Sequence, residues 1–149
     1  MLGYLDAPEK TAECLSEDGW LMTGDICDYD EEGYLYIKDR KKELIKVRGF
    51  PVAPAELEAL LLTHEDIKDA AVVPVQREDG ELPKAFVVIK EDSRSKEITD
   101  EDISKWFNNN VAPYKRLHGG IEFIDEIPKT ASGKILRRLL VERLKKSNT

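Results

Sequence analysis

The segment at residues 128–134, which reads PKTASGK, contains a lysine that can act on anionic groups. Its Gly–Lys pair with small hydroxyl residues is typical of phosphate-binding loops. The P-loop pattern is excluded, because no glycine stands five residues before Gly133 and Ile135 follows Lys134 in place of serine or threonine. What remains is a lysine on a loop, able to neutralise charge that develops on a carboxylate or a phosphate in a transition state. The alternative interpretation is a loop at a helix start with exposed basic residues.

A second candidate segment, residues 39–50, reads DRKKELIKVRGF and holds five cations and two anions. Cations in this arrangement can hold phosphates or a ribose. Gly49 would let a thin, linear substituent approach the backbone closely, because glycine has no side chain. The alternative is a solvated, charged linker with an edge hairpin.

Asp25 is the third candidate, because it follows Thr23 and Gly24 at a turn. An aspartate held after a glycine turn can accept hydrogen bonds from vicinal hydroxyls such as those of a ribose. The alternative is an aspartate that caps its own backbone.

The histidines and cysteines indicate neither a metal site nor a nucleophilic triad. His64 and His118 have no partners at metal-ligand or triad spacing and are interpreted as surface residues. Cys14 and Cys27 lack CxxC spacing, which favours reduced, unreactive thiols.

Composition excludes several classes of function. The net charge of -7 argues against nucleic-acid binding, and no apolar run approaches the ~20 residues that cross a bilayer. The first residues lack the layout of a secretory signal and the last are not a peroxisomal signal, so the expected location is cytoplasmic. Charge is uneven, with a local balance of -8 over residues 1–38 and +6 over residues 129–146. This difference indicates two parts with different roles.

The elements that must position these side chains follow from apolar spacing and turn residues. Short strands are predicted at residues 19–21, 33–37, 44–47, 50–52, 70–75, 85–89 and 121–124. Helices are predicted from Pro54, over residues 99–110 with Thr99 as N-cap, and after Gly133. This order predicts a small α+β domain, in which a central short sheet is flanked by helices and preceded by an acidic β-hairpin.

Taken together, these segments resemble one family in one order. They read DGWLMTGD at 18–25, YLYIKDRKKELIK at 34–46, PAELE at 54–58 and PKTASGK at 128–134. The set is similar to successive motifs of the adenylate-forming acid–CoA ligases, a family that includes acyl-CoA synthetases, 4-coumarate–CoA ligases and firefly luciferase. Two residues depart from the pattern: Pro51 stands where relatives often carry glutamine, and Arg48 replaces a common lysine.

The resemblance implies an enzymatic activity. Members of this family activate a carboxylic acid with ATP and Mg²⁺ to an acyl-adenylate, releasing pyrophosphate. They then pass the acyl group to the thiol of CoA, and the small domain rotates between the two half-reactions. The expected ligands of the whole enzyme are therefore a small carboxylic acid, ATP, Mg²⁺ and CoA.

The resemblance also implies roles for single residues. Lys134 would be the adenylation lysine and Lys46 the catalytic lysine of the thioester face. Asp25 and Arg40 would hold ATP, Lys42 would be the hinge residue, and Arg48 and Gly49 would lie near the pantetheine of CoA.

The resemblance further implies a division into domains. Residues 1–38 would be the end of a large N-terminal domain, 39–42 the hinge, and 43–149 the small mobile C-terminal domain. The phosphate loop, the acid pocket and the magnesium ligand belong to the large domain, so that domain is an expected partner and the chain alone is expected to be inactive. Residues 1–38 are expected to be poorly ordered or to pair with another copy of the chain.

Two other functions remain open at this point. One is a module that binds CoA or nucleotides, or associates with a full-length ligase, without activity of its own. The other is an adenylating domain that loads a carrier protein in place of free CoA.

Overall fold

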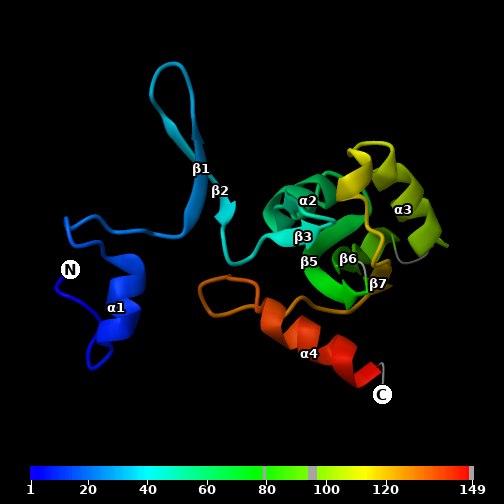
Figure 1. Cartoon of the computed structure of the whole chain (residues 1–149). Helices are drawn as coiled ribbons and strands as arrows, with labels where there is room; N and C mark the ends of the chain where they lie inside the picture. The colour runs from blue at the N-terminus through cyan, green and yellow to red at the C-terminus, as the bar shows by residue number, and fades with distance from the viewer. Residues whose placement is uncertain (79, 94–96, 148–149) are drawn as a thin grey trace. The chain divides into compact units, whose positions relative to one another are not determined.

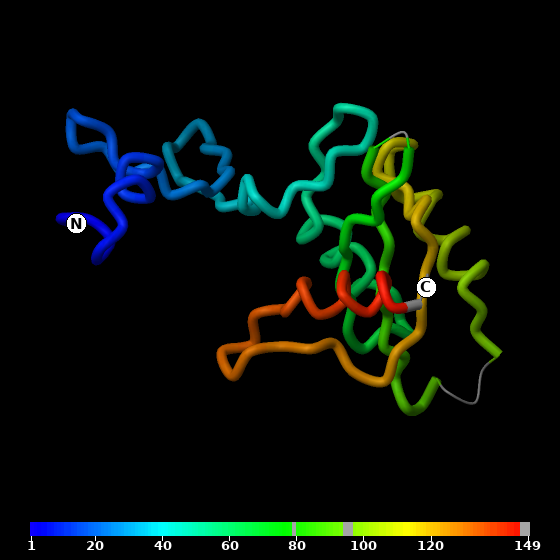
Figure 2. Tube along the Cα trace, turned by 60° about the horizontal axis from the view of Figure 1, so that its bottom comes forward, coloured from blue at the N-terminus to red at the C-terminus, as the bar shows by residue number. Residues whose placement is uncertain are grey.

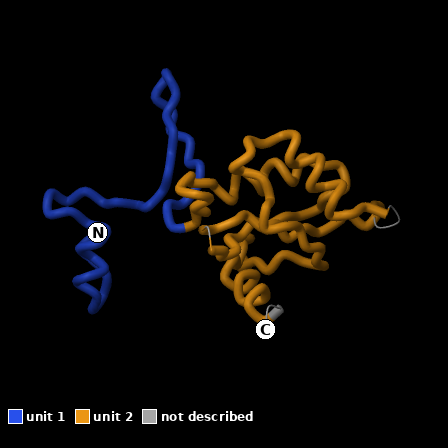
Figure 3. Tube along the Cα trace, turned by 45° about the vertical axis from the view of Figure 1, so that its right-hand side comes forward, with its two compact units in different colours: residues 1–42 blue, residues 43–149 orange. Residues whose placement is uncertain are grey.

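The computed structural model describes residues 1–78, 80–93 and 97–147. The chain forms two compact units, residues 1–42 and residues 43–149 (Figure 3).

The first unit contains a short helix and a hairpin (Figure 1). The helix is α1 (Pro8–Cys14), and strand β1 (Asp25–Tyr29) pairs antiparallel with β2 (Leu35–Arg40). Asp30 closes the hairpin, because its Oδ1 accepts hydrogen bonds from the backbone N–H groups of Glu32 and Tyr34. The Tyr34 N–H and the Tyr36 hydroxyl lower the pKa of the Asp30 carboxyl, since both donate to its charged form.

The strand predicted at residues 19–21 is wrong. Leu21 forms only an isolated bridge with Leu15, and the partner of β2 is the segment Asp25–Tyr29. The reason is the turn at Asp30, which is so short that the residues directly before it pair with those directly after it. Helix α1 is a further difference, and its signals are a proline at the helix start and Glu9 in the first turn.

The second unit is built on a three-stranded sheet in the order β5–β6–β7. Strand β5 (Ile67–Arg77) pairs antiparallel with β6 (Gly80–Ile89), and β7 (Ile121–Phe123) lies parallel to β6. The first two strands extend beyond their predicted limits, because ladder pairing continues into the polar residues at the end of each strand. A second small sheet is the hairpin of β3 (Ile45–Val47) and β4 (Phe50–Val52).

Both faces of the central sheet are covered by helices (Figures 1 and 2). The helices are α2 (Pro54–Leu61) and α3 (Asp100–Asn108) on one face and α4 (Arg137–Ser147) on the other. Successive side chains of β5 point to opposite faces of the sheet. Val72 packs in the apolar cluster that includes residues of α2 and α3, and Val73 packs in the cluster that includes Leu140 of α4. The predicted α+β arrangement, a short sheet between helices, is confirmed. Short single-turn 3₁₀ segments at Glu91–Ser93 and Pro113–Lys115 complete the unit.

Helix α3 begins where the sequence predicts. Thr99 Oγ1 accepts a hydrogen bond from Asp102 N at 3.1 Å, and Asp102 Oδ2 accepts one from Thr99 N at 3.2 Å. This reciprocal pair is a capping box, which satisfies N–H groups that the helix itself leaves unpaired. Ile103 and Phe107 are fully buried on the inner side of the helix.

Candidate functional site

The β3–β4 hairpin presents Lys46, Arg48 and Gly49 to solvent. Ile45 and Val47 are buried on either side of Lys46, so the alternation of the strand directs the lysine outward. The loop between the strands consists of Arg48 and Gly49, both with positive φ (48° and 88°), as in the type I′ turn that suits tight hairpins. The sequence therefore places three predicted site residues on one exposed edge.

Arg48 is held in a conformation that few residues other than glycine adopt. Left-handed φ costs an L-residue with a β-carbon roughly 1–2 kcal/mol, and asparagine tolerates it better than arginine does. A strained residue of this kind at an exposed loop is a sign of a functional demand on its side chain.

A groove of about 500 Å³ lies beside the hairpin. Its lining residues are Val47, Arg48, Phe50, Leu82, Pro113, Tyr114, Arg116 and His118. The rings of Phe50 and Tyr114 stack with their centroids 5.2 Å apart. Apolar rings next to two arginines can hold a ligand that is flat at one part and anionic at another.

Arg116 supports this interpretation. Its Nε is buried, and within the described part of the chain it has no hydrogen-bond partner. A buried donor without a partner is rare and calls for a ligand or a bound water. Tyr114, Arg116 and His118 were not among the predicted site residues. The available signal was an aromatic residue followed by two adjacent cations in the run PYKRLH at 113–118, which is separated from the end of helix α3 by residues 109–112.

The predicted adenylation lysine lies on a separate, internally braced turn. Thr130 N donates to Lys134 O at 2.9 Å, Lys134 N donates to Thr130 Oγ1 at 3.1 Å, and Gly133 N donates to Thr130 O at 2.9 Å. Gly133 has φ of 82°, which explains why glycine precedes the lysine. The Lys134 residue is exposed. Among the described residues, no hydrogen bond or ion pair connects this turn with the β3–β4 hairpin.

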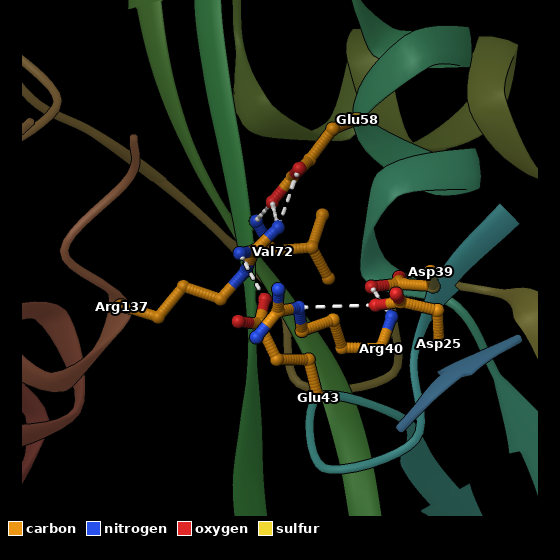
Figure 4. Close-up of polar contacts among 7 residues, drawn as sticks. All are labelled: Asp25, Asp39, Arg40, Glu43, Glu58, Val72 and Arg137. Carbon is orange, nitrogen blue, oxygen red and sulfur yellow. Dashed lines mark hydrogen bonds and ion pairs between the residues drawn. The ribbon is translucent and has the colours of Figure 1, made fainter. Parts of the chain in front are cut away.

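In the first unit the structure brings Asp25 and Arg40 together. They are paired residues of β1 and β2, and Arg40 Nε lies 3.2 Å from Asp25 Oδ1 (Figure 4). Asp39 is buried and its Oδ1 accepts a hydrogen bond from Arg40 N at 2.7 Å. Lys42, the predicted hinge residue, is exposed and follows β2 at the end of this unit.

Residues 1–78, 80–93 and 97–147 contain neither a cluster of metal ligands nor a membrane-spanning helix. Within these ranges no group of three or more His, Cys, Asp or Glu side chains is placed to hold a metal ion. No helix of the same ranges is long and apolar enough to span a membrane.

Comparison with known proteins gives the family. The model of the AMP-binding enzyme C-terminal domain matches residues 56–134. This chain belongs to that family. The match confirms the resemblance to adenylate-forming enzymes that the ordered motifs carry.

Two curated relatives match nearly the whole length of this chain. It is 51% identical over 145 residues to 4-coumarate–CoA ligase 1 of Narcissus pseudonarcissus, covering 97% of this chain and 26% of that protein. It is 48% identical over 147 residues to luciferin 4-monooxygenase of Luciola mingrelica, covering 98% of this chain and 26% of that protein. The chain therefore spans about a quarter of the length of the curated relatives it matches.

Solved structures show the same fold. ATP-bound MatB from Rhodopseudomonas palustris superimposes with a TM-score of 0.87 at 30% identity, over 99% of this chain and 29% of that one. The o-succinylbenzoate–CoA synthetase MenE of Bacillus subtilis, in complex with its acyl-adenylate intermediate, gives a TM-score of 0.80 at 30% identity, over 94% of this chain and 28% of that one.

Proposed function

We propose that this chain is the C-terminal, mobile part of an ATP-dependent carboxylic acid–CoA ligase. The observation that carries the proposal is the match of 97% of the chain to a 4-coumarate–CoA ligase at 51% identity. The enzyme would join a carboxylic acid to AMP with release of pyrophosphate, and then transfer the acyl group to the thiol of CoA.

In the first half-reaction, Lys134 would stabilise the negative charge shared by the attacking carboxylate and the α-phosphate. Its turn supports this role, because hydrogen bonds to Thr130 hold the backbone while the side chain stays free to reach a ligand. Asp25 and Arg40 would bind the ribose hydroxyls of ATP, and their pairing holds the carboxylate in place before ATP arrives. Mg²⁺ would enter with the phosphates of ATP, and we place its protein ligands in the large domain.

In the second half-reaction, the β3–β4 hairpin would face the acyl-adenylate. Gly49 adds no side chain to the path of the pantetheine arm, and apart from Gly49 and its two chain neighbours no heavy atom lies within 4 Å of the position its β-carbon would take. Lys46 and Arg48 would attract the phosphates of CoA, and the groove with Tyr114 and Arg116 would hold the nucleotide end.

The two faces need different poses of the same domain. We propose residues 1–38 as the end of the large domain, 39–42 as the hinge around Lys42, and 43–149 as the mobile domain that turns between the poses. The division of the chain into compact units at residues 42 and 43 supports this proposal.

A CoA-binding module without activity is the second candidate. It is favoured by the fact that every residue lining the groove belongs to residues 43–149.

The test is a hybrid enzyme in which this chain replaces the matching part of a 4-coumarate–CoA ligase. We expect the hybrid to release pyrophosphate with ATP, Mg²⁺ and 4-coumarate, and to form the thioester when CoA is added. Lys134→Ala should slow pyrophosphate release by about 100-fold or more and leave transfer from presynthesised coumaroyl-adenylate to CoA nearly unchanged. CoA binding by the chain, with a folded hybrid that forms no adenylate, would instead favour the binding module.

A further inference from the structure

Arg137 joins three segments that lie far apart in the sequence. It is the first residue of α4 and stands three residues after Lys134. Its Nη1 donates to Glu43 Oε2, and its Nη2 donates to Glu58 Oε1 at 2.9 Å and Oε2 at 2.8 Å (Figure 4). The side chains of Arg137, Glu58 and Glu43 are 19%, 9% and 27% exposed, so these ion pairs are largely shielded from water. Such pairs hold geometry far better than exposed ones.

Glu58 connects this cluster to the sheet. Its Oε1 also accepts a hydrogen bond from the backbone N–H of Val72 at 2.8 Å. Strand β5 lies at the edge of the sheet β5–β6–β7, so on its outer side no further strand accepts hydrogen bonds from its backbone. Glu58 accepts the hydrogen bond of the Val72 N–H in place of such a strand. Arg137 is therefore fixed to the rigid core of the second unit through Glu58.

Glu43 connects the cluster to the start of the second unit. It is the first residue of that unit and directly follows the proposed hinge at residues 39–42. Its ion pair with Arg137 spans 94 positions of sequence. The loop that carries Lys134 is also tied at its other end, because Lys129 Nζ lies 2.6 Å from Asp69 Oδ2 on β5. Both ends of the loop are thus anchored, one of them to the residue where the unit begins.

We propose that Arg137 is a positioning residue for the adenylation step. Arg137 fixes the Lys134 loop to Glu43, the residue that follows the hinge. When the second unit rotates at the hinge, Lys134 therefore moves with it rigidly. This inference rests on the proposed function, since it assigns Lys134 to adenylate formation. Transfer of the acyl group to CoA depends less on Arg137, because the β3–β4 hairpin used in that step is held by its own buried residues, Ile45 and Val47.

The first measurement uses the chain alone. Amide NMR and hydrogen exchange are compared for wild type, Arg137→Met, Glu43→Gln and Arg138→Met. Arg138 is the matched control, because it is the next residue of the same helix, is 85% exposed and pairs with Glu142 one turn later. Glu43→Gln is the mild variant, because it leaves the Arg137–Glu58 pair in place.

We expect Arg137→Met to shift the amides of Gly133–Leu136 and of Glu43 together, with Phe107 of α3 unchanged. Glu43→Gln should give a smaller change at the same two places, and Arg138→Met none at Glu43. Shifts spread evenly over α3 and the sheet would overturn the proposal in favour of general stabilisation. A Lys134 loop that is unaffected in Arg137→Met would overturn it as well.

The second measurement separates the half-reactions in the hybrid enzyme. Arg137→Met should slow adenylate formation by about 100-fold, because small displacements of a reacting group have effects of that size, while transfer from presynthesised adenylate to CoA changes by less than about threefold. Glu43→Gln should reduce the same half-reaction by a smaller factor. Equal losses in both half-reactions would overturn the proposal. An inactive wild-type hybrid would count against the proposed function, and the NMR comparison would still decide whether Arg137 connects the loop to Glu43.

Discussion

At the scale of single residues, the turn at Arg48 and Gly49 shows a conflict between conformation and function. Both residues have positive φ, yet the first is an arginine in place of the asparagine or glycine that such turns favour. The strain at Arg48 is explained if its guanidinium is required at the edge of the groove.

This conflict gives a prediction for Arg48→Asn. The variant should be more stable by a few tenths to about 1 kcal/mol, because asparagine adopts left-handed φ more readily. It should also bind CoA more weakly, because a cation is lost from the groove. Urea unfolding and calorimetric titration with CoA measure the two effects. Undiminished CoA affinity would remove the functional reason for the arginine.

Arg116 gives a second prediction at this scale. Arg116→Met removes a buried Nε that has no partner in the described residues, so the fold should lose little stability. If the groove holds the phosphates of CoA, the affinity should fall by about tenfold or more, since a charge-assisted hydrogen bond is lost. Titration of the chain with CoA checks this, with Arg138→Met as the matched surface control. Equal affinities for the two variants would show that CoA binds elsewhere.

At the scale of elements, helix α3 depends on its capping box. Two hydrogen bonds lower the pKa of the Asp102 carboxyl below its ordinary value of 3.8. The larger effect comes from the Thr99 hydroxyl, and the smaller comes from the Thr99 backbone N–H. The folded state therefore favours charged Asp102. Its contribution to stability is present above pH 3.8 and is lost as the pH falls below 3.8 through the lowered pKa.

Thr99→Ala tests the box. At neutral pH it should reduce the free energy of unfolding by about 1 kcal/mol, the usual effect of losing an N-cap side chain. The difference in free energy of unfolding between wild type and variant, called the gap, should become smaller as the pH falls below 3.8. The reason is that the wild type then loses the same interaction. Urea unfolding at both pH values measures the gap. A gap that stays constant with pH would mean that Asp102 charge has no part in the cap.

At the scale of the whole molecule, the two units differ in how much they bury. In residues 1–42, all of which the structure describes, Asp39 is the only buried residue. Large apolar side chains of this unit are exposed, among them Leu2, Leu5, Trp20, Tyr29 and Ile37. The second unit instead has buried clusters on both faces of its sheet. Stability therefore resides in residues 43–149.

We predict that residues 43–149 fold by themselves. Deleting residues 1–42 should change their free energy of unfolding by no more than about 0.5 kcal/mol. In the whole chain, amides of β1 and β2 should exchange faster than those of β5 and β6, as measured by hydrogen exchange at a concentration where sedimentation shows a monomer. Equal protection of the two units in a monomer would contradict this. Protection of β1 and β2 that rises with concentration would show pairing between copies through residues 1–42.

Much of the fold and part of the site follow from local sequence. The cap at Thr99 and the tight turn at Arg48 and Gly49 are each set by residues a few positions apart, and the structure contains both as predicted. The strand predicted at residues 19–21 failed because an apolar run alone does not tell which of two nearby segments a turn will pair. The roles of Lys134, Lys46, Asp25, Arg40 and Lys42 remain predictions.

The family and the α+β class could be predicted without the structure, because both depend on ordered motifs and on periodicity within short windows. The groove at Arg116 and the cluster at Arg137 became visible only in the folded chain. In the cluster, Arg137 is 79 positions away from Glu58 in the sequence and 94 positions away from Glu43. No local pattern specifies such contacts, since they exist only once helix α4 has packed against the sheet and brought its first residue to the edge of β5.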